Sequence, residues 1–404
     1  MRVTALLGAG ASVDIGGPLS VDLTRSVRSK LQEIYDLKTG HVTKVPFLND
    51  IAAELDNYFS PTISHFEDIF YTLESLSSYA RGWQSKTVKK FKPHMGSFVD
   101  AKKQYFFDEF LLYIAKKDLL TVVGDSIDEY DSLFDPVLKH SWYSSFWSDA
   151  VSQCQWDIAT LNYDHCIESS INQYEDGYED IGQICKRFNP RKLLDNNTDS
   201  KILHLHGSIL YGHYSTSDNR YMFEDQHEDL YLYPSYKDAK DTWFNRSFSV
   251  AQSHDETYVG PIVTGLRKTD KLLPYPYNTY YHQFQKSLIE NDRLLIIGYS
   301  FGDYHLNSLL ERVVRYHGQN RKIVIISYFP DPKSWIPDPY VMNWPGNEML
   351  NFIAKAFKDP TPFYNTLQFQ EMFESEDKRT RIYLGGVNHT FNKYGREIID
   401  FLTK

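Results

Sequence analysis

The chain has 404 residues, which at about 150 residues per domain corresponds to two or three folding units. Its 53 Asp and Glu residues outnumber its 43 Lys and Arg residues, and the formal net charge of −10 argues against broad binding to nucleic acid or acidic lipid. The 3 cysteines exclude a disulfide framework and a four-cysteine zinc ribbon, so we expect a cytoplasmic protein.

Short apolar runs bounded by Gly, Asp or Asn predict buried strands along the chain. These runs are Val3–Leu7, Asp157–Leu161, Ile202–Leu205, Pro261–Thr264, Leu294–Ile297, Ile323–Ser327 and Ile382–Leu384. Helical patterns lie between several of them, at Asp164–Tyr174, Tyr280–Glu290 and His305–Tyr316. Apolar strands that alternate with helices indicate an α/β fold, with a Rossmann-like parallel sheet and helices on both faces.

Two long intervals interrupt this alternation. Residues 31–150 contain helical stretches near Ser64–Tyr79, Gln104–Lys117 and Ser126–Leu138, so we expect a large helical insertion or cap. Residues 211–257 have poor periodicity and predict an irregular insertion, and a further helix is expected at Gly346–Phe357. The chain is therefore predicted to be a single unit, with core segments 1–30, 151–210 and 258–400.

Neither secretion nor membrane insertion is expected. The apolar run Val3–Leu7 is too short for the core of a signal peptide. The best apolar helix candidate, Phe106–Val123, contains Asp108, Lys116 and Asp118, so it cannot span a bilayer.

A loop of small residues directly follows the first predicted strand. It consists of Gly8, Ala9, Gly10, Ala11 and Ser12. Glycines at such a corner let the backbone approach a phosphate, and the N–H groups of a following helix bind an anion. The dinucleotide fingerprint needs a third glycine where Val13 stands, and Thr24–Tyr35 has a helical pattern where that fingerprint needs an acidic strand end. The loop predicts a nucleotide site outside the ordinary dehydrogenases, and a tight turn without a ligand is the alternative.

The ends of the second and third predicted strands carry Asn162 and His206. Ligands of a parallel sheet collect beyond the carboxyl ends of the strands. The amide of Asn162 can hold a water or a hydroxyl, and the imidazole of His206 can exchange a proton near neutrality. Two alternatives remain: Asn162 could cap a helix that begins near Asp164, and His204, expected on the same strand face as His206, could be a hydrogen-bonded core histidine. We favour His206 for chemistry because it borders the turn at Gly207.

A second glycine corner follows the strand Leu294–Ile297, with Gly298, Ser300 and Asp303 before the next helix. Ser300 can offer a hydroxyl to a phosphate or ribose. Asp303 fits a helix N-cap, a ligand contact, or both.

Taken in order, four motifs resemble the catalytic core of the sirtuins, and more closely the bacterial sirtuin-like proteins of anti-phage defence. They are Gly8–Ser12, Thr160–Asp164, His206–Ser208 and Gly298–Ser300. The resemblance implies NAD as the ligand, with Asn162 positioning a water or the nicotinamide ribose and His206 as the catalytic base. It further implies pyrophosphate contacts from the whole Gly8–Ser12 loop, Ala9 included. Asp164 would lie in the nicotinamide pocket, and Gly298, Ser300 and Asp303 near the adenosine half.

The chain departs from the protein-deacylating sirtuins in one respect. Those enzymes carry a four-cysteine zinc module after the His-Gly motif, whereas residues 207–260 contain no cysteine. His213, His227 and His254 lie there with no recognisable zinc spacing, and we interpret them as surface histidines. The resemblance therefore implies a metal-independent NAD+ glycohydrolase that produces ADP-ribose and nicotinamide.

The defence proteins also imply an abortive-infection effector that forms a homo-oligomer and can pair with a separate HerA-type ATPase. Two other functions stay open at this point. One is an NAD- or ADP-ribose-binding sensor or scaffold without turnover, and the other is ADP-ribosyl transfer to a macromolecule.

Overall fold

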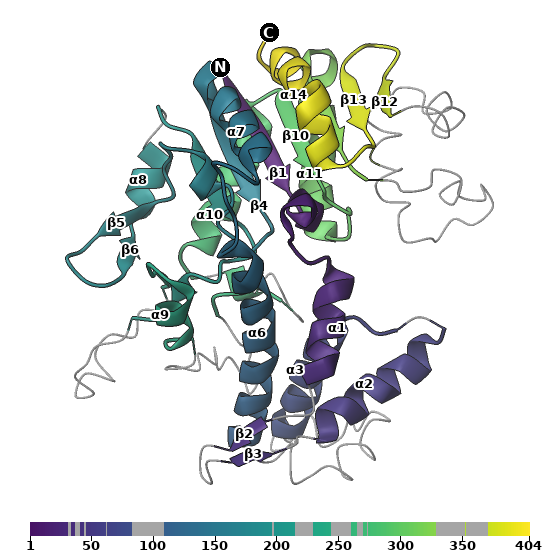
Figure 1. The fold of residues 1–404 in the computed structure, drawn as a ribbon, viewed down its shortest axis with the longest axis vertical. Coiled ribbons are helices and arrows are strands. Elements are labelled where there is room, and N and C mark those ends of the chain that lie inside the picture. Colours follow the sequence, from purple (N-terminus) through teal and green to yellow (C-terminus); the bar gives the residue numbers. More distant parts are fainter. Residues whose placement is uncertain are drawn as a thin grey trace.

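The structure is a computed structural model of the chain. It describes residues 1–30, 34–36, 41–43, 46–61, 63–82, 109–195, 198–214, 229–243, 260–264, 270–272, 274–328, 352 and 371–404. These residues form a sheet-based core that contains both chain termini and, beyond one end of the sheet, a group of long helices (Figure 1).

The main sheet of the described residues has seven strands. They are β1 (Arg2–Leu7), β4 (Gln155–Thr160), β7 (Lys201–His204), β10 (Arg293–Ile297), β11 (Lys322–Ile326), β12 (Met372–Glu374) and β13 (Thr380–Tyr383). Their spatial order is β12-β13-β11-β10-β1-β4-β7, and every pair except β12–β13 is parallel. The six parallel strands, numbered along the chain, have the 3-2-1-4-5-6 order of a Rossmann-like sheet.

The strand order reverses between β1 and β10, which are neighbours in the centre of the sheet. Leu7 pairs with Ile297, so the two central strands end at the same level. The loops after β1 and β10 therefore leave the sheet side by side, at the switch point where ligands of such sheets bind.

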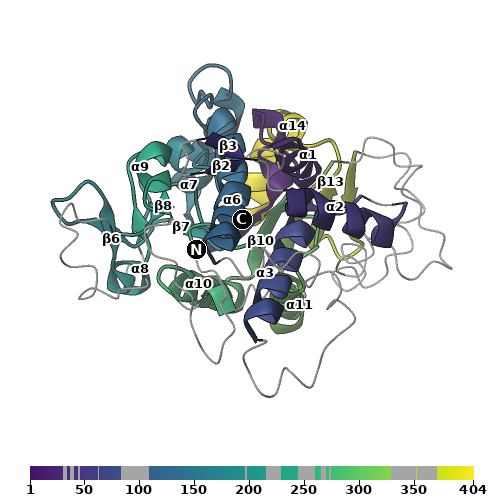
Figure 2. The ribbon, with the colours of Figure 1, turned by 90° about the horizontal axis from the view of Figure 1, so that it is seen from below.

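Alternate residues of the central strands enter two separate apolar clusters, one on each face of the sheet. Ala5 and Leu295 pack in one cluster with Phe146 of α7 (Ser141–Gln153) and with α14 (Val387–Thr403). Their neighbours along the strands pack in the other cluster with α10 (Tyr277–Glu290) and α11 (Tyr304–His317). Figure 2 shows the two helix pairs on opposite sides of the strands. Burial on both faces explains why these strands are almost purely apolar and confirms the predicted fold class.

Six of the seven predicted strands are present, with ends shifted by a few residues. The seventh, Pro261–Thr264, is wrong, because this segment forms only an isolated antiparallel bridge between Ile262 and Gly207. The helices expected at Tyr280–Glu290 and His305–Tyr316 are confirmed as α10 and α11.

The helix predicted at Asp164–Tyr174 is wrong, since the described residues there contain only a 3-10 turn, Glu168–Ser170. The pattern over Thr24–Tyr35 is helical only as far as Lys30, where α1 ends, and Ile34–Asp36 is a strand, β2, paired with β3 (His41–Thr43).

We name the long helices beyond the carboxyl ends of the strands the helical region. It consists of α1 (Ser20–Lys30), α2 (Pro46–Phe59), α3 (Phe66–Gly82) and α6 (Glu109–Asp131). α3 confirms the expected Ser64–Tyr79 helix, whereas the two helices predicted at Gln104–Lys117 and Ser126–Leu138 form a single one, α6. The helical region and one face of the sheet share an apolar cluster. α7, which begins within the predicted insertion 31–150, covers that same face of the sheet. The division into core and insertion segments stays a prediction.

The described part of residues 211–257 contains two short strands and one short helix, and the irregular insertion expected there stays a prediction. A second, antiparallel sheet has the order β5-β6-β9-β8, with β5 (Tyr178–Asp180), β6 (Lys186–Phe188), β8 (Tyr211–Gly212) and β9 (Tyr231–Leu232). Two short helices accompany it, α8 (Pro190–Asp195) and α9 (Tyr236–Lys240). The helix expected at Gly346–Phe357 falls outside the described residues apart from residue 352. None of the described helices has the length and apolar character needed to span a membrane.

Candidate active site at the switch point

The loop after β1, residues 8–12, packs directly on the loop after β10. The N–H group of Gly8 donates to the carbonyl of Ile297, and that of Gly10 donates to the carbonyl of Gly298, both at 2.9 Å. A Cβ on Gly8 would lie 2.7 Å from the Gly298 oxygen, and one on Gly298 would lie 2.2 Å from the nitrogen of Ala11. Gly298 also has a positive φ of 60°. The glycines are therefore required for two loops to approach each other.

Four of the five amides of the β1 loop, all except that of Ala9, donate to carbonyls that the structure describes. The N–H groups of Ala11 and Ser12 donate to the carbonyls of Gly8 and Ala9 within a 3-10 turn. No α-helix of the described residues follows this loop directly, because a second 3-10 turn intervenes and α1 begins only at Ser20. The expected helix N-terminus behind the loop is therefore wrong.

Asn162 lies in the loop after β4, residues 161–167, which we name the Asn loop. Its Nδ2 donates to Ser12 Oγ at 2.9 Å, and Ser12 Oγ donates to Asp164 Oδ2 at 2.9 Å. Helix capping by Asn162 is excluded because no described α-helix begins near Asp164. Among the described residues no donor reaches Asn162 Oδ1, so the amide carbonyl is the group that can accept from a ligand.

Asp164 is buried beneath Asn162 and holds three donors. Besides Ser12, its carboxylate accepts from the hydroxyl of Tyr130 at 2.5 Å and from the N–H of Cys166 at 3.2 Å. Burial raises the pKa of Asp164, and the nearby charge of Asp131 adds to this effect. The resemblance to the sirtuins implied a place for Asp164 in a nicotinamide pocket, and its contacts in the structure orient the Ser12–Asn162 pair.

His206 lies past the end of β7 and faces the loop after β10. Its Nε2 is 3.3 Å from Asp303 Oδ2, with exposed fractions of 9% and 11% for the two side chains. The main chain of this turn is fixed by a hydrogen bond from Val263 N to the His206 carbonyl at 2.8 Å. Gly207 has a φ of 94°, and a Cβ there would lie 2.0 Å from the oxygen of Pro261, so only glycine permits the turn.

Asp303 performs two tasks with its two oxygens. Oδ1 caps α11 by accepting from the N–H groups of His305 and Leu306, at 3.1 and 3.4 Å, while Oδ2 faces His206. The predicted N-cap is thus confirmed. Ser300 is exposed at the same corner, where its hydroxyl is 3.5 Å from the position that a Cβ on Gly302 would take.

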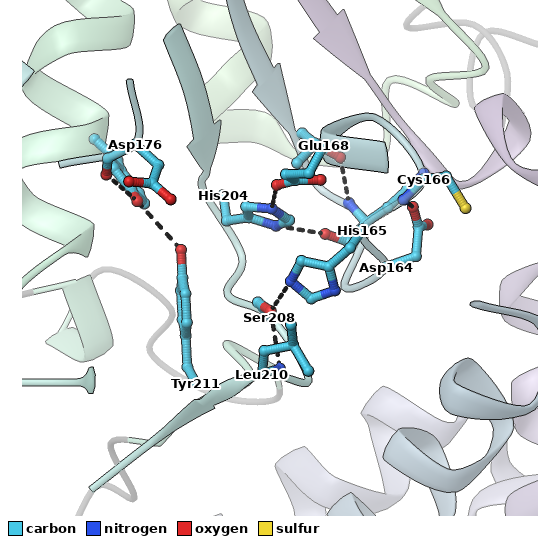
Figure 3. A network of polar contacts seen from close by, with 12 residues as sticks. Asp164, His165, Cys166, Glu168, Asp176, His204, Ser208, Leu210 and Tyr211 are labelled. Carbon is cyan, nitrogen blue, oxygen red and sulfur yellow. Dashed lines mark hydrogen bonds and ion pairs between the residues drawn. The ribbon is translucent and has the colours of Figure 1, made fainter. Parts of the chain in front are cut away.

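His204 has different partners from His206, because β7 ends at His204 and the alternation of the strand stops there. Its Nε2 is 2.5 Å from Glu168 Oε1, and its Nδ1 is 3.3 Å from the carbonyl of Asn162 (Figure 3). Burial would raise the pKa of Glu168, but the charge and hydrogen bond of His204 outweigh it and lower that pKa. His204 is therefore a hydrogen-bonded core histidine, and the expected common face with His206 is wrong.

His165 completes this polar network. Its side-chain Nε2 is 2.8 Å from Ser208 Oγ, and its backbone N–H donates to Asp131 Oδ1 at 2.8 Å. Ligand atoms of His165, Glu168 and His204 lie within 4.8 Å of one another, as do those of a second group formed by Asp131, Asp164 and Cys166. In the first group Glu168 and His204 form an ion pair with each other, and in the second Asp164 accepts hydrogen bonds from three protein donors. These side chains are therefore already bound to partners within the protein.

Sequence reasoning missed Tyr130, Asp131 and Glu168. Tyr130 and Asp131 belong to the helical region, where no pattern indicated contact with the strand ends, and Glu168 was assigned to a helix that does not form. His213, expected at the surface, is buried with 2% exposure, which corrects that prediction. His227 and His254 lie outside the described residues.

Comparisons with known proteins found a family model and solved structures that are similar to this chain. The model of the SIR2-like domain matches residues 157–340, which include the loops after β4, β7 and β10 but not β1. A structure concerned with sirtuin substrate affinity is 12% identical with a TM-score of 0.34, and covers 81% of this chain and 82% of its own. A variant of a Sir2 homologue in complex with ADP-ribose is 13% identical with a TM-score of 0.34, at 88% and 91% coverage. No curated protein matches the chain. Residues 157–340 of this α/β protein are thus similar to the SIR2-like domain.

Proposed function

We propose that this protein is an NAD+ glycohydrolase that cleaves NAD into ADP-ribose and nicotinamide. The observation that carries the proposal is the pairing of His206 with Asp303 beside the switch point, where Asn162 also presents its amide. A base with a fixed carboxylate partner and an oriented amide are the groups that activation of a water needs.

The reaction assigns a task to each residue. The C1′–N bond of the nicotinamide ribose breaks, and its electron pair neutralises the positively charged ring nitrogen of the departing nicotinamide. Water adds to C1′ and gives its proton to His206, while Asp303 stabilises the imidazolium that forms. The carbonyl of Asn162 accepts a hydrogen bond from the water or from a ribose hydroxyl. None of these steps requires a metal.

His206 is the better candidate for the base than His204. Both ring nitrogens of His204 face acceptors of the protein, the Glu168 carboxylate and the Asn162 carbonyl. Both ring nitrogens are therefore occupied by protein partners, and neither is left to take a proton from a water.

The absence of cysteine in residues 207–260 favours hydrolysis over lysine deacylation, because the zinc module of the deacylating sirtuins has no counterpart in that sequence. By resemblance to the defence proteins, we further propose a cytoplasmic, homo-oligomeric effector of abortive infection. A separate HerA-type ATPase is the proposed partner, and neither a membrane nor nucleic acid is expected to bind directly.

Incubation of the purified protein with NAD, followed by chromatography for nicotinamide, tests the activity. We expect nicotinamide release, and a loss of roughly 10²- to 10⁴-fold in His206→Ala and Asn162→Ala. The assay is run with and without the proposed ATPase. Binding of NAD without release would indicate a sensor, and label transferred from NAD to a macromolecule would indicate ADP-ribosyl transfer. Equal release by the parent and both variants would refute the residue assignment.

A further inference from the structure

The carboxyl end of α6 contacts the Asn loop through two consecutive side chains. Tyr130 donates its hydroxyl to Asp164 Oδ2 at 2.5 Å. Asp131 Oδ1 accepts from the N–H of His165 at 2.8 Å and lies 3.7 Å from Cys166 Sγ. Three consecutive residues of the Asn loop are therefore attached to the last turn of one helix.

The hydrogen bonds from Tyr130 to Asn162 have a defined direction. An ionised Asp164 can only accept, so Ser12 donates its single hydroxyl proton to Asp164 and must accept from Asn162 Nδ2. This arrangement turns the carbonyl of Asn162 away from the network. Tyr130 gives the same Asp164 oxygen its second donor, which stabilises the buried carboxylate.

Removal of the Tyr130 hydroxyl makes the ionised form of Asp164 less favourable, and this orientation of the Asn162 amide depends on that form. Because Asp164 is 5% exposed, its carboxylate depends on protein donors, and burial already favours its protonated form. A protonated Asp164 can donate to Ser12, whose own proton is then available to the Asn162 carbonyl. The amide of Asn162 would no longer have a single preferred orientation.

The other end of α6 belongs to the packing of the helical region. α6 has 23 residues, so it is about 34 Å long, and it packs against α1 and α3 (Figure 1).

The helical region also contacts the turn that holds His206. Glu74 of α3 forms a buried ion pair with Lys271 at 2.9 Å, and Lys271 donates to the carbonyl of Thr264. The neighbouring Val263 is hydrogen-bonded to the His206 carbonyl. Both loops with proposed catalytic side chains are thus attached to helices beyond the sheet.

We propose that Tyr130, in the last turn of α6, is a positioning residue for Asn162. The proposal rests on the proposed function, since it concerns the same site. It gives the last turn of α6 a role in the reaction beyond packing.

The test compares Tyr130→Phe with a matched control, Tyr236→Phe. Tyr236 also donates a tyrosine hydroxyl to a carboxylate, Asp125 of α6, at 2.9 Å, but the hydrogen bonds of the described residues do not connect it to Asn162. We expect Tyr130→Phe to lower kcat for nicotinamide release roughly 10- to 100-fold with KM changed less than about threefold, because the Tyr130 hydroxyl is bound to Asp164 and acts on Asn162 only through it. Tyr236→Phe should keep the parental kcat. Equal rates in the parent and Tyr130→Phe, or equal losses in both variants, would overturn the proposal.

A double-mutant cycle separates positioning from general destabilisation. If Tyr130 acts through Asn162, Tyr130→Phe has no further effect in the Asn162→Ala background, whereas an independent effect leaves the losses multiplicative. If the parent binds NAD without cleaving it, hydrolysis is refuted and the same cycle is measured on the dissociation constant by calorimetry. There, non-additive losses support positioning and additive ones refute it. A parent that neither binds nor cleaves NAD refutes both proposals.

Discussion

The pairing of Asp303 with His206 leads to a prediction in which charge and helix capping can be separated. Replacing Asp303 by Asn keeps an N-cap of equal quality for α11 but removes the negative charge 3.3 Å from His206 Nε2. If the charge stabilises the imidazolium formed when water loses its proton, the variant folds normally and turns over slowly.

The expected loss follows from the burial of the pair. With exposed fractions of 9% and 11%, the two side chains are little screened by solvent. A hydrogen bond to a charged group contributes about 1.5–3 kcal/mol and a neutral one about 0.5–1.5 kcal/mol, so the charge itself contributes about 1–2 kcal/mol. Because this interaction gains strength only when the proton has moved, the loss appears in the barrier. We expect kcat/KM for nicotinamide release to fall roughly 5- to 30-fold.

Asp303→Ala is the companion variant. It loses the charge and also the cap, which costs about 1 kcal/mol of folding stability, so its Tm should fall while that of Asp303→Asn stays near the parental value. Kinetics of nicotinamide release and thermal unfolding are measured on all three proteins. Full activity in Asp303→Asn, or a loss of activity that follows Tm alone, would show that Asp303 serves α11 and not the reaction.

Three further predictions concern the frame of the site. His204→Ala should lower the free energy of unfolding by about 3–5 kcal/mol in urea, because the Glu168 carboxylate then loses its ion-pair partner. Adding Glu168→Leu should restore part of the lost stability. An unchanged stability in His204→Ala would contradict the ion pair. Gly298→Ala should lower the free energy of unfolding by at least about 2 kcal/mol and also abolish nicotinamide release, since its Cβ would lie 2.2 Å from a backbone nitrogen at a positive φ. A stable, active variant would show that the two loops can separate freely. The hydrogen bond from Arg28 lowers the pKa of Asp56 to about 2, so its stabilisation is present above about pH 4 and is lost as the pH falls toward 2. The pair is partly exposed, and Asp56→Asn should therefore cost roughly 1 kcal/mol or less at pH 7 and progressively less as the pH falls toward 2, whereas a pH-independent difference would exclude the charge as its cause.

The sheet could be predicted from sequence because its strands are buried on both faces and are therefore apolar at nearly every position. Leu294–Ile297 and Ile323–Ser327 stand out for this reason, and both are strands within a residue of the expected bounds. The right-handed connection between parallel strands then leaves few topologies, of which the observed order is one. Pro261–Thr264 has a similar composition, but it lies beside the turn at Gly207 and pairs through a single bridge.

The segment after β4 shows where local pattern is overruled by tertiary contacts. Residues 164–174 have helical periodicity, and the contacts of Asp164 and Asp131 with the N–H groups of Cys166 and His165 are compatible with a helix start. The turn nevertheless ends at Ile171, which is extended, and Glu175 donates its N–H to the carbonyl of Ser200 beside β7. Ser200 lies 25 residues later in the chain, so a local window could not include this pairing.

A tertiary contact also explains why the sequence predicts two helices where the structure has the single helix α6. Gly124 weakens the helical pattern between the two predicted stretches, and Gly is normally unfavourable within a helix. In the fold a Cβ at position 124 would lie 2.5 Å from the hydroxyl of Tyr236, so glycine is needed for α9 to pack on α6. The uninterrupted helix is what brings Tyr130 to the Asn loop, and its role was therefore invisible in the sequence.

The glycine loops show why a motif and its chemistry must be argued separately. Gly8 and Gly10 were expected to make room for a phosphate and Gly298 to lie near the adenosine half, but their missing Cβ atoms make room for each other's backbone. This requirement would hold in a protein with no ligand. Asn162 and His206 differ, because neither side chain is needed to end a strand, and each is oriented by polar partners from a different loop. The proposed activity therefore depends on these two side chains, and the glycines support it by holding the loops after β1 and β10 together.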